Sequence, residues 1–159
     1  MLDDLIKKAS EKLNGYMELK NTLYYLSKNN SILLVNNKIM KKNLGRLGER
    51  AAGYWDSEDK KVYISEELSK IEKYSMLEAL LHELIHAYRN LNNISSNRIT
   101  EEIIATAISL KILGDILYAE RRLKRFEKLK KEYYKLLIQL YYLKISSYIL
   151  IPIILPVLY

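Results

Sequence analysis

Two histidines and one glutamate in the middle of the chain are the residues best suited to chemistry. His82 and His86 are the only histidines among the 159 residues, they lie four positions apart, and Glu83 directly follows the first. On a helix, residues four positions apart share one face, so both imidazoles would point the same way. This His-Glu-x-x-His pattern is typical of a zinc site, in which two ring nitrogens bind the metal and the carboxylate accepts a proton from water.

The residues around the motif predict the helix that it needs. Ser75 and Glu78 match a Ser-x-x-Glu capping box, which would start the helix at Ser75. The arc that faces away from the histidines is apolar and consists of Leu77, Leu80, Leu81, Leu84, Ile85 and Tyr88. One face would therefore pack in a core while the other presents the imidazoles. The alternative is an ordinary amphipathic helix with surface or core histidines, but the histidines avoid the apolar arc.

A catalytic zinc site needs a third protein ligand and one open position. The chain has no cysteine and no further histidine, so this ligand must be a carboxylate. Glu101 and Glu102 are the downstream candidates, fifteen and sixteen residues after His86, and a loop and a helix reversal fit in that gap. Both acids also lie in the first turn of a helix that Thr100 would cap, where interaction with the helix dipole is their ordinary role.

The segment Leu81-His82-Glu83-Leu84-Ile85-His86-Ala87 resembles the active-site helix of the zincin metallopeptidases. The residues before it, from Gly45-Arg46 through Gly53-Tyr54-Trp55 to Val62-Tyr63-Ile64-Ser65, are similar to the strand-rich lead-in of the SprT-like proteases and the minigluzincins. The resemblance covers residues 32–113 and implies an α+β fold. This would be a mostly helical zincin-like domain with a small three- or four-stranded sheet packed on the helix of the motif.

The resemblance also implies which glutamate binds the metal. In several gluzincin groups the ligand glutamate is followed by Ala three residues later and Asp four residues later. Glu102 is followed by Ala105 and Thr106 at these positions, so this register implies Zn²⁺ held by His82, His86 and Glu102. Because Thr106 stands where Asp is common, support for the ligand histidines would come from elsewhere.

The mechanism that the resemblance implies is hydrolysis of a peptide bond. Glu83 would act as the general base, taking a proton from zinc-activated water and passing it to the leaving amine. Related enzymes often stabilise the oxyanion with Tyr or His, and Tyr88 and Tyr118 are candidates among the 14 tyrosines. An extended peptide would bind along a sheet edge, where Trp55 would line the cleft or pack in the core.

Length and composition predict a single domain with its own hydrophobic core. The absence of cysteine excludes disulfides and thiolate ligands and agrees with a cytoplasmic location. The N-terminus is acidic and polar, which predicts no signal peptide. Helices are expected over 2–29 with an interruption at Gly15, then over 66–73, 75–90, 100–119 and 120–143. Strands are expected over 32–35, 51–55 and 61–64, with a strand or an irregular segment over 38–40.

The net charge of +7 is concentrated near the C-terminus, because residues 120–144 hold nine Lys or Arg and three Glu. We therefore divide the chain into a metallopeptidase domain (1–119), a basic amphipathic helix (120–144) and an apolar tail (145–159). The basic helix would dock with a solvated face or contact anionic lipid or nucleic acid, although no nucleic-acid motif is present. The tail would pack on the domain, anchor peripherally at a membrane, or occupy the cleft and keep the enzyme latent, as the minigluzincin resemblance implies.

The leading prediction is a zinc-dependent endopeptidase that acts on a peptide or protein substrate, in the cytoplasm, with membrane association through residues 120–159. The alternative is a binding or regulatory module of the same fold that contacts membrane or nucleic acid through its basic helix. Glu83 favours the enzyme, because a pure binding site needs no general base. Zinc-assisted hydrolysis of a non-peptide amide is a third interpretation.

Overall fold

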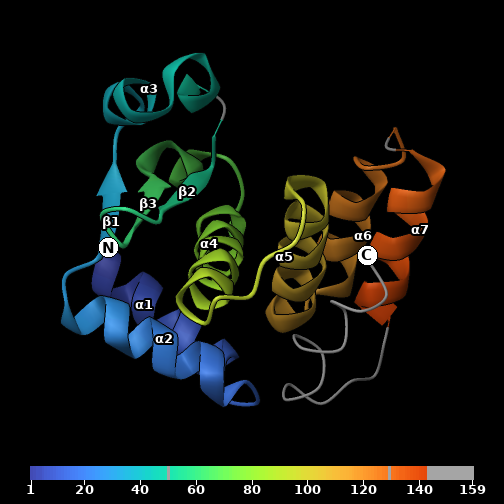
Figure 1. Cartoon of the computed structure of the whole chain (residues 1–159), viewed down its shortest axis with the longest axis horizontal. Helices are drawn as coiled ribbons and strands as arrows, with labels where there is room; N and C mark the ends of the chain where they lie inside the picture. The colour runs from blue at the N-terminus through green and yellow to red at the C-terminus, as the bar shows by residue number, and fades with distance from the viewer. Residues whose placement is uncertain (50, 129, 143–159) are drawn as a thin grey trace.

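Helix α4 (Ser75–Leu91), which carries the histidine motif, runs through the middle of the protein (Figure 1). The computed structural model describes residues 1–49, 51–128 and 130–142. The sheet and the N-terminal helices α1 (Leu2–Lys12) and α2 (Met17–Lys28) lie on one side of α4, and α5 (Arg98–Leu113) lies on the other. The apolar arc explains this position, because the side chains of Leu80, Leu81, Leu84 and Ile85 are fully buried.

The sheet has three strands in the order β1-β3-β2. Strand β1 (Ile32–Val35) runs parallel to β3 (Lys61–Ser65), and β2 (Gly53–Asp56) runs antiparallel to β3, with Trp55 opposite Val62. In the part of the chain that the structure describes, β2 is therefore an edge strand. The expected α+β class with a small sheet against the motif helix is confirmed, and the three predicted strands are present.

Two local predictions in the N-terminal half had different outcomes. The helical segment 2–29 is interrupted around Gly15 as expected, with α1 ending at Lys12 and α2 beginning at Met17. The prediction of a strand or irregular segment over 38–40 is wrong, because α3 (Asn37–Leu44) occupies it and leads into the 3₁₀ helix η1 (Gly45–Glu49). The Asn36 side chain caps α3 by accepting a hydrogen bond from the Ile39 N–H.

The predicted capping box at the start of α4 is wrong. The N-cap position is Tyr74, which follows the 3₁₀ helix η2 (Glu66–Lys70) by a few residues, and no side chain caps the helix. The Glu78 carboxylate instead accepts hydrogen bonds from the Tyr118 hydroxyl and from Nε of Arg122. These partners come from a distant helix, and bonds between charged groups are stronger than a bond to a backbone N–H.

The C-terminal helices begin and end elsewhere than predicted. Asn97, not Thr100, caps the start of α5. The helix ends at Leu113, and Gly114 after it has a φ of 72°. Asp115 then caps α6 (Ile116–Lys124) by accepting a hydrogen bond from the Tyr118 N–H. A left-handed glycine followed by a capping aspartate ends one helix and starts the next, so the boundary predicted at residue 119 is wrong.

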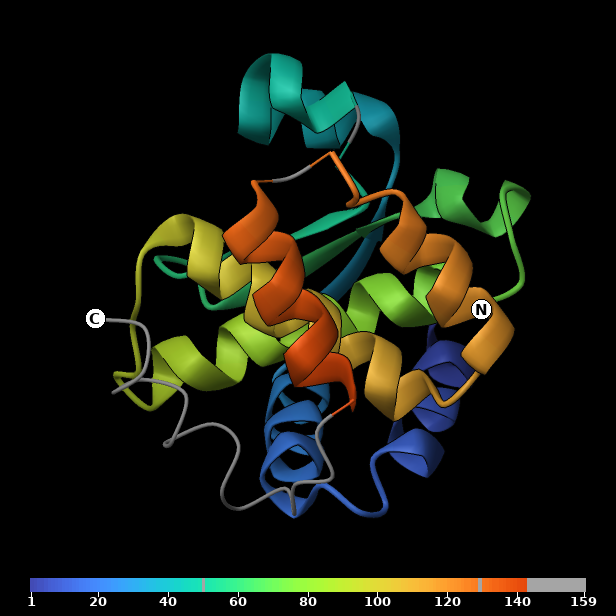
Figure 2. The same cartoon turned by 90° about the vertical axis from the view of Figure 1, so that its right-hand side faces the viewer.

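The basic segment 120–144 is not one helix, which corrects the sequence-based expectation. Helix α6 ends at Lys124, and α7 (Lys131–Tyr142) begins seven residues later. Arginines of α6 and of the turn after it form ion pairs with Glu72 and Glu78 near the start of α4, whereas α7 packs along α5 (Figure 2). The first half of the segment thus contacts the start of α4 and the second half contacts α5, and the chain turns between them.

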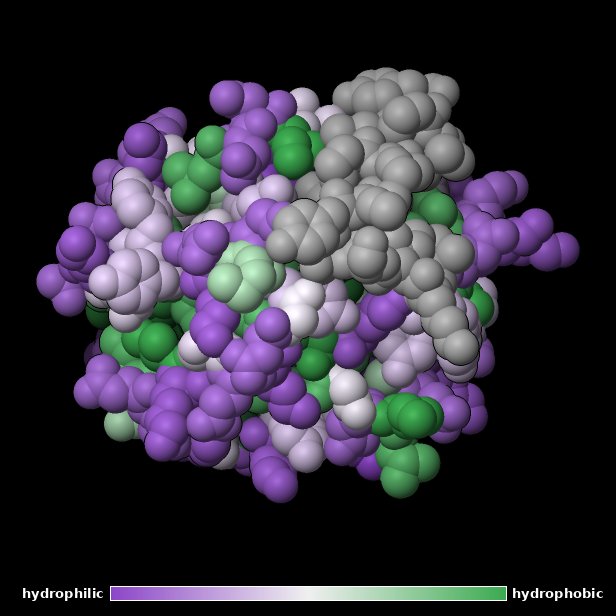
Figure 3. Space-filling view, turned by 90° about the horizontal axis from the view of Figure 1, so that it is seen from below, coloured by the Kyte–Doolittle hydropathy of each residue, from purple (hydrophilic) through white to green (hydrophobic). Residues whose placement is uncertain are grey.

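The surface seen from below is mainly hydrophilic, and its apolar residues form separate patches (Figure 3). Among the residues that the structure describes, no helix is both long enough and apolar enough to cross a membrane. The predicted apolar tail, residues 145–159, lies outside the described residues, so its three proposed roles stay predictions.

Candidate metal centre

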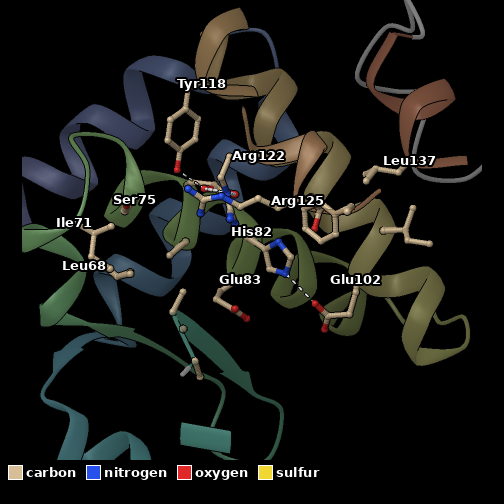
Figure 4. A pocket seen from close by; sticks show the side chains of 18 of the residues that line it. Leu68, Ile71, Ser75, His82, Glu83, Glu102, Tyr118, Arg122, Arg125 and Leu137 are labelled. Carbon is tan, nitrogen blue, oxygen red and sulfur yellow. Dashed lines mark hydrogen bonds and ion pairs between the residues drawn. The ribbon is translucent and has the colours of Figure 1, made fainter. Parts of the chain in front are cut away.

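The packing of α4 against α5 brings the two histidines and one glutamate together. His82 Nε2 lies 3.1 Å from His86 Nε2 and 3.3 Å from a carboxylate oxygen of Glu102. The other Glu102 oxygen lies 3.6 Å from His86 Nε2. Figure 4 shows His82 and Glu83 from α4 and Glu102 from α5 around one cavity. Glu102, sixteen residues after His86, thus completes one cluster of nitrogen and oxygen donors.

The cluster fits a tetrahedral zinc ion in both donor type and separation. Zinc–nitrogen and zinc–oxygen bonds of about 2.0–2.1 Å in a tetrahedron place ligand atoms about 3.3–3.4 Å apart. The two ring nitrogens are 3.1 Å apart, and the Glu102 carboxylate lies 3.3 Å from His82 through one oxygen and 3.6 Å from His86 through the other, which is near that value. Two imidazoles and one carboxylate are also the donor set of a catalytic zinc site that keeps one position open.

Burial affects the protonation of the two imidazoles differently. Burial first, and the neighbouring His82 second, lower the pKa of His86 to about 4, so its imidazole is neutral near pH 7 and able to bind a metal. Burial also acts to lower the pKa of His82. The hydrogen bond to Glu102 and the nearby carboxylates act in the opposite direction and raise the pKa of His82 overall.

Glu101 is held away from the cluster by a different set of partners. Its carboxylate accepts hydrogen bonds from Nε and a terminal nitrogen of Arg89, at 2.7 and 2.8 Å, and one from the Ser96 hydroxyl at 2.6 Å. The structure therefore brings Glu102, and not Glu101, to the histidines. Arg89 lies in the last turn of α4 and is 1% exposed, so this ion pair ties the end of α4 to the start of α5.

The Arg89–Glu101 pair is the part of the site that sequence reasoning missed. The pair positions the turn of α5 that carries Glu102. Thr106, four residues after Glu102 at the position where several gluzincins have Asp, is buried in α5. The sequence contains only a weak signal for the pair, an arginine before the loop and an acid after it. Support for a metal ligand from neighbouring groups commonly fixes its orientation.

The side chain of Glu83 extends from α4 toward the edge strand β2. This side chain is buried, and a backbone hydrogen bond from Trp55 reaches it. Burial raises the pKa of the Glu83 carboxyl to about 7, against the lowering effect of His82. Such a carboxylate could serve as a general base, because it is held in place beside the candidate metal-binding cluster without belonging to it.

Gly53 provides the space that Glu83 occupies. A Cβ atom at Gly53 would lie 2.8 Å from the Tyr63 carbonyl oxygen, 2.9 Å from Cδ1 of Ile64 and 3.0 Å from Cγ of Glu83. These separations are shorter than normal contacts, so any side chain here would force the strand or Glu83 to move. The close approach of β2 to α4 therefore requires glycine at this position.

The Gly53→Ala variant is expected to lower the free energy of unfolding by about 1–3 kcal/mol, as overpacking does. Urea denaturation measures this effect. The matched control is Gly15→Ala, because nothing lies within 4 Å of a Cβ at Gly15. Equal behaviour of the two variants would contradict the role of Gly53.

Two cavities meet at the cluster. The larger, of about 740 Å³, extends toward η2, α6 and α7, and the other, of about 590 Å³, extends along β2 toward the loop before α5. The cavities share five lining residues, which are Ala51, Gly53, Glu83, Arg98 and Glu102. We call this shared border the seam. His82 lines the larger cavity and His86 the smaller one, so the candidate metal-binding cluster lies at the seam.

The structure does not bring the two tyrosine candidates for the oxyanion to the metal ligands. Tyr118 lines the larger cavity, but its hydroxyl is hydrogen-bonded to Glu78, and burial raises its pKa. Tyr88 packs against the hydrophobic core and lines neither cavity. Trp55 lines the smaller cavity as expected and also packs against the core.

Comparison of the chain with protein-family models, with curated proteins and with solved structures found no match. The assignment of a function therefore depends on the residues and geometry of the site.

Proposed function

We propose that this protein is a zinc-dependent endopeptidase of the gluzincin type. One observation carries the proposal: the ring nitrogens of His82 and His86 and the Glu102 carboxylate lie within 3.1–3.6 Å of one another, near the ligand spacing around zinc, with the buried Glu83 beside them. A metal-storage or structural site would need no adjacent carboxylate outside the ligand set and no open cavity.

Each residue of the cluster has a part in the hydrolysis of a peptide bond. When bound, zinc supplies a Lewis acid that polarises the scissile carbonyl and lowers the pKa of water. Glu83 takes one proton from the attacking water, whose oxygen adds to the carbonyl carbon while the π electrons move to the carbonyl oxygen. Glu83 then gives the proton to the amide nitrogen, the C–N bond breaks, and a carboxylic acid and an amine leave.

The shape of the site supports internal cleavage of an extended chain. The cavities continue on both sides of the seam, so residues before and after the scissile bond have room to bind. Strand β2 borders the seam and is an edge strand within the described part of the chain, so its backbone can pair with a peptide. A site for terminal residues alone would be closed on one side.

The alternative, a binding module that acts through its basic C-terminal segment, has less support. Within the described residues, Arg122 is paired with Glu78, and both Arg121 and Arg125 are paired with Glu72. Part of the positive charge of the segment is thus compensated inside the molecule, where it holds α6 against α4.

Metal analysis with a cleavage assay tests the proposal. The protein is expected to bind one equivalent of zinc and to cleave an unfolded protein in a chelator-sensitive reaction. The His86→Ala and Glu102→Ala variants are expected to lose both properties, because two remaining donors hold zinc weakly. The exposed Glu120→Ala is the matched control. The assay is run on the full chain and on a chain that ends at residue 144, which is expected to be more active if the tail keeps the enzyme latent.

Stoichiometric zinc in the Glu102→Ala variant would contradict the ligand assignment. Zinc bound by the wild type without turnover, even after removal of the tail, would favour the binding module instead.

A further inference from the structure

Arg98 is the cationic residue at the seam. It lines both cavities, together with Glu83 and Glu102. Arg98 lies one turn before Glu102 on α5, so the two side chains share a face of the helix. The guanidinium therefore borders the same space as the carboxylates of Glu83 and Glu102.

The fold itself gives no reason for an arginine at this position. Arg98 is the first residue of α5, where the helix dipole favours acids and disfavours cations. Its side chain is exposed, and it makes no hydrogen bond or ion pair with residues 1–49, 51–128 or 130–142. By contrast, Arg89 and Arg122 are buried or partly buried and are committed to Glu101 and Glu78.

The proposed reaction needs a hydrogen-bond donor that the described histidine and tyrosine candidates do not supply. Negative charge develops on the scissile carbonyl oxygen, and hydrolases stabilise it with hydrogen-bond donors aimed at that oxygen. Both histidines belong to the metal cluster, Tyr118 is bonded to Glu78, and Tyr88 lines neither cavity. A guanidinium offers five N–H donors and a permanent positive charge.

We propose that Arg98 is a catalytic residue that donates hydrogen bonds to the oxyanion formed when water adds to the scissile carbonyl. This inference rests on the proposed peptidase function. Glu83 holds the proton from the water while the oxygen carries the negative charge beside Arg98. When the C–N bond breaks, the electrons return to re-form the carbonyl and the proton goes to the amine. Arg98 is unchanged throughout and consumes no co-reactant.

Kinetics of Arg98→Gln and Arg98→Lys test this role in the zinc-loaded full chain. The Gln variant is expected to lower kcat by about 10²- to 10³-fold, the typical loss on removal of an oxyanion donor. KM is expected to stay within about threefold, because the interaction forms mainly in the transition state. The Lys variant is expected to recover part of kcat, since it keeps a charge but not the planar fork. Zinc content and Tm are expected to stay as in the wild type.

The matched control is Arg46→Gln, an exposed arginine that lines neither cavity. A second measurement does not depend on turnover: the fluorescence of Trp55, the only tryptophan, follows binding of a phosphinic peptide, which mimics the tetrahedral anion. Arg98→Gln is expected to weaken this binding by about the same factor as kcat, as transition-state complementarity requires.

The outcomes separate this inference from the function on which it rests. Unchanged kcat in Arg98→Gln, or equal affinity of both proteins for the phosphinic peptide, overturns the role of Arg98. A loss confined to peptides with an acidic side chain also overturns it and makes Arg98 a specificity residue. If the wild type binds zinc but cleaves no peptide, the endopeptidase proposal fails, and the phosphinic peptide still tests Arg98.

Discussion

Replacement of Glu83 by glutamine is expected to lower kcat for peptide hydrolysis by about 10²- to 10⁴-fold, the usual contribution of a general base. Glutamine has nearly the same shape but cannot take the proton from water. Since Glu83 is not among the residues whose donor atoms form the cluster, the variant is expected to keep one equivalent of zinc. Steady-state kinetics and metal analysis on the same preparation measure both properties.

The control for this experiment is Glu58→Gln, which removes an exposed carboxylate in the turn between β2 and β3. It is expected to leave both kcat and zinc content at the wild-type level. Retention of full activity by Glu83→Gln would rule out its role as the base. Loss of zinc together with activity would instead indicate that Glu83 maintains the structure of the metal site.

The Arg89→Met variant is expected to lower the free energy of unfolding by about 3–5 kcal/mol, the range found when one partner of a buried ion pair is removed. Glu101 would be left in a partly buried place without its two charged hydrogen bonds. Because Glu101 precedes Glu102, the ligand carboxylate is expected to become less well oriented and zinc affinity to fall by about 10- to 100-fold. Urea denaturation and competition with a chelator measure these effects.

The double variant Arg89→Met/Glu101→Gln is the informative control. It removes both charges, so it is expected to regain part of the stability that the single variant loses. An Arg89→Met variant that unfolds at the wild-type urea concentration would show that the pair contributes little. An Arg89→Met variant that is destabilised but binds zinc as tightly as the wild type would show that the ion pair stabilises the fold without orienting Glu102.

Interactions between distant segments account for two of the wrong local predictions. Ser75 and Glu78 satisfy the sequence rule for a capping box, but Glu78 bonds to Tyr118 and Arg122 from α6. The basic segment reads as one helix by periodicity, yet its arginines bind Glu72 and Glu78 while α7 packs on α5. Local patterns carry no information about a partner that is forty residues away.

The sequence by itself determined which side chains a metal site in this chain could use. The chain has two histidines one helical turn apart and no cysteine, so a three-ligand site built on both histidines would need a carboxylate as its third ligand. The apolar arc of the same helix determined that it would be buried, because helical periodicity is a local property. The three strands and the α+β class followed from equally local patterns of apolar and turn residues.

Only the tertiary structure decided between Glu101 and Glu102. The two residues are adjacent and of the same type, but on a helix they point about 100° apart, so the packing of α5 on α4 directs one to Arg89 and the other to the histidines. The same packing sets Gly53 against Glu83 and places Arg98 at the seam between the cavities. Such contacts depend on how two elements meet in space, and the residues of either element alone do not specify that.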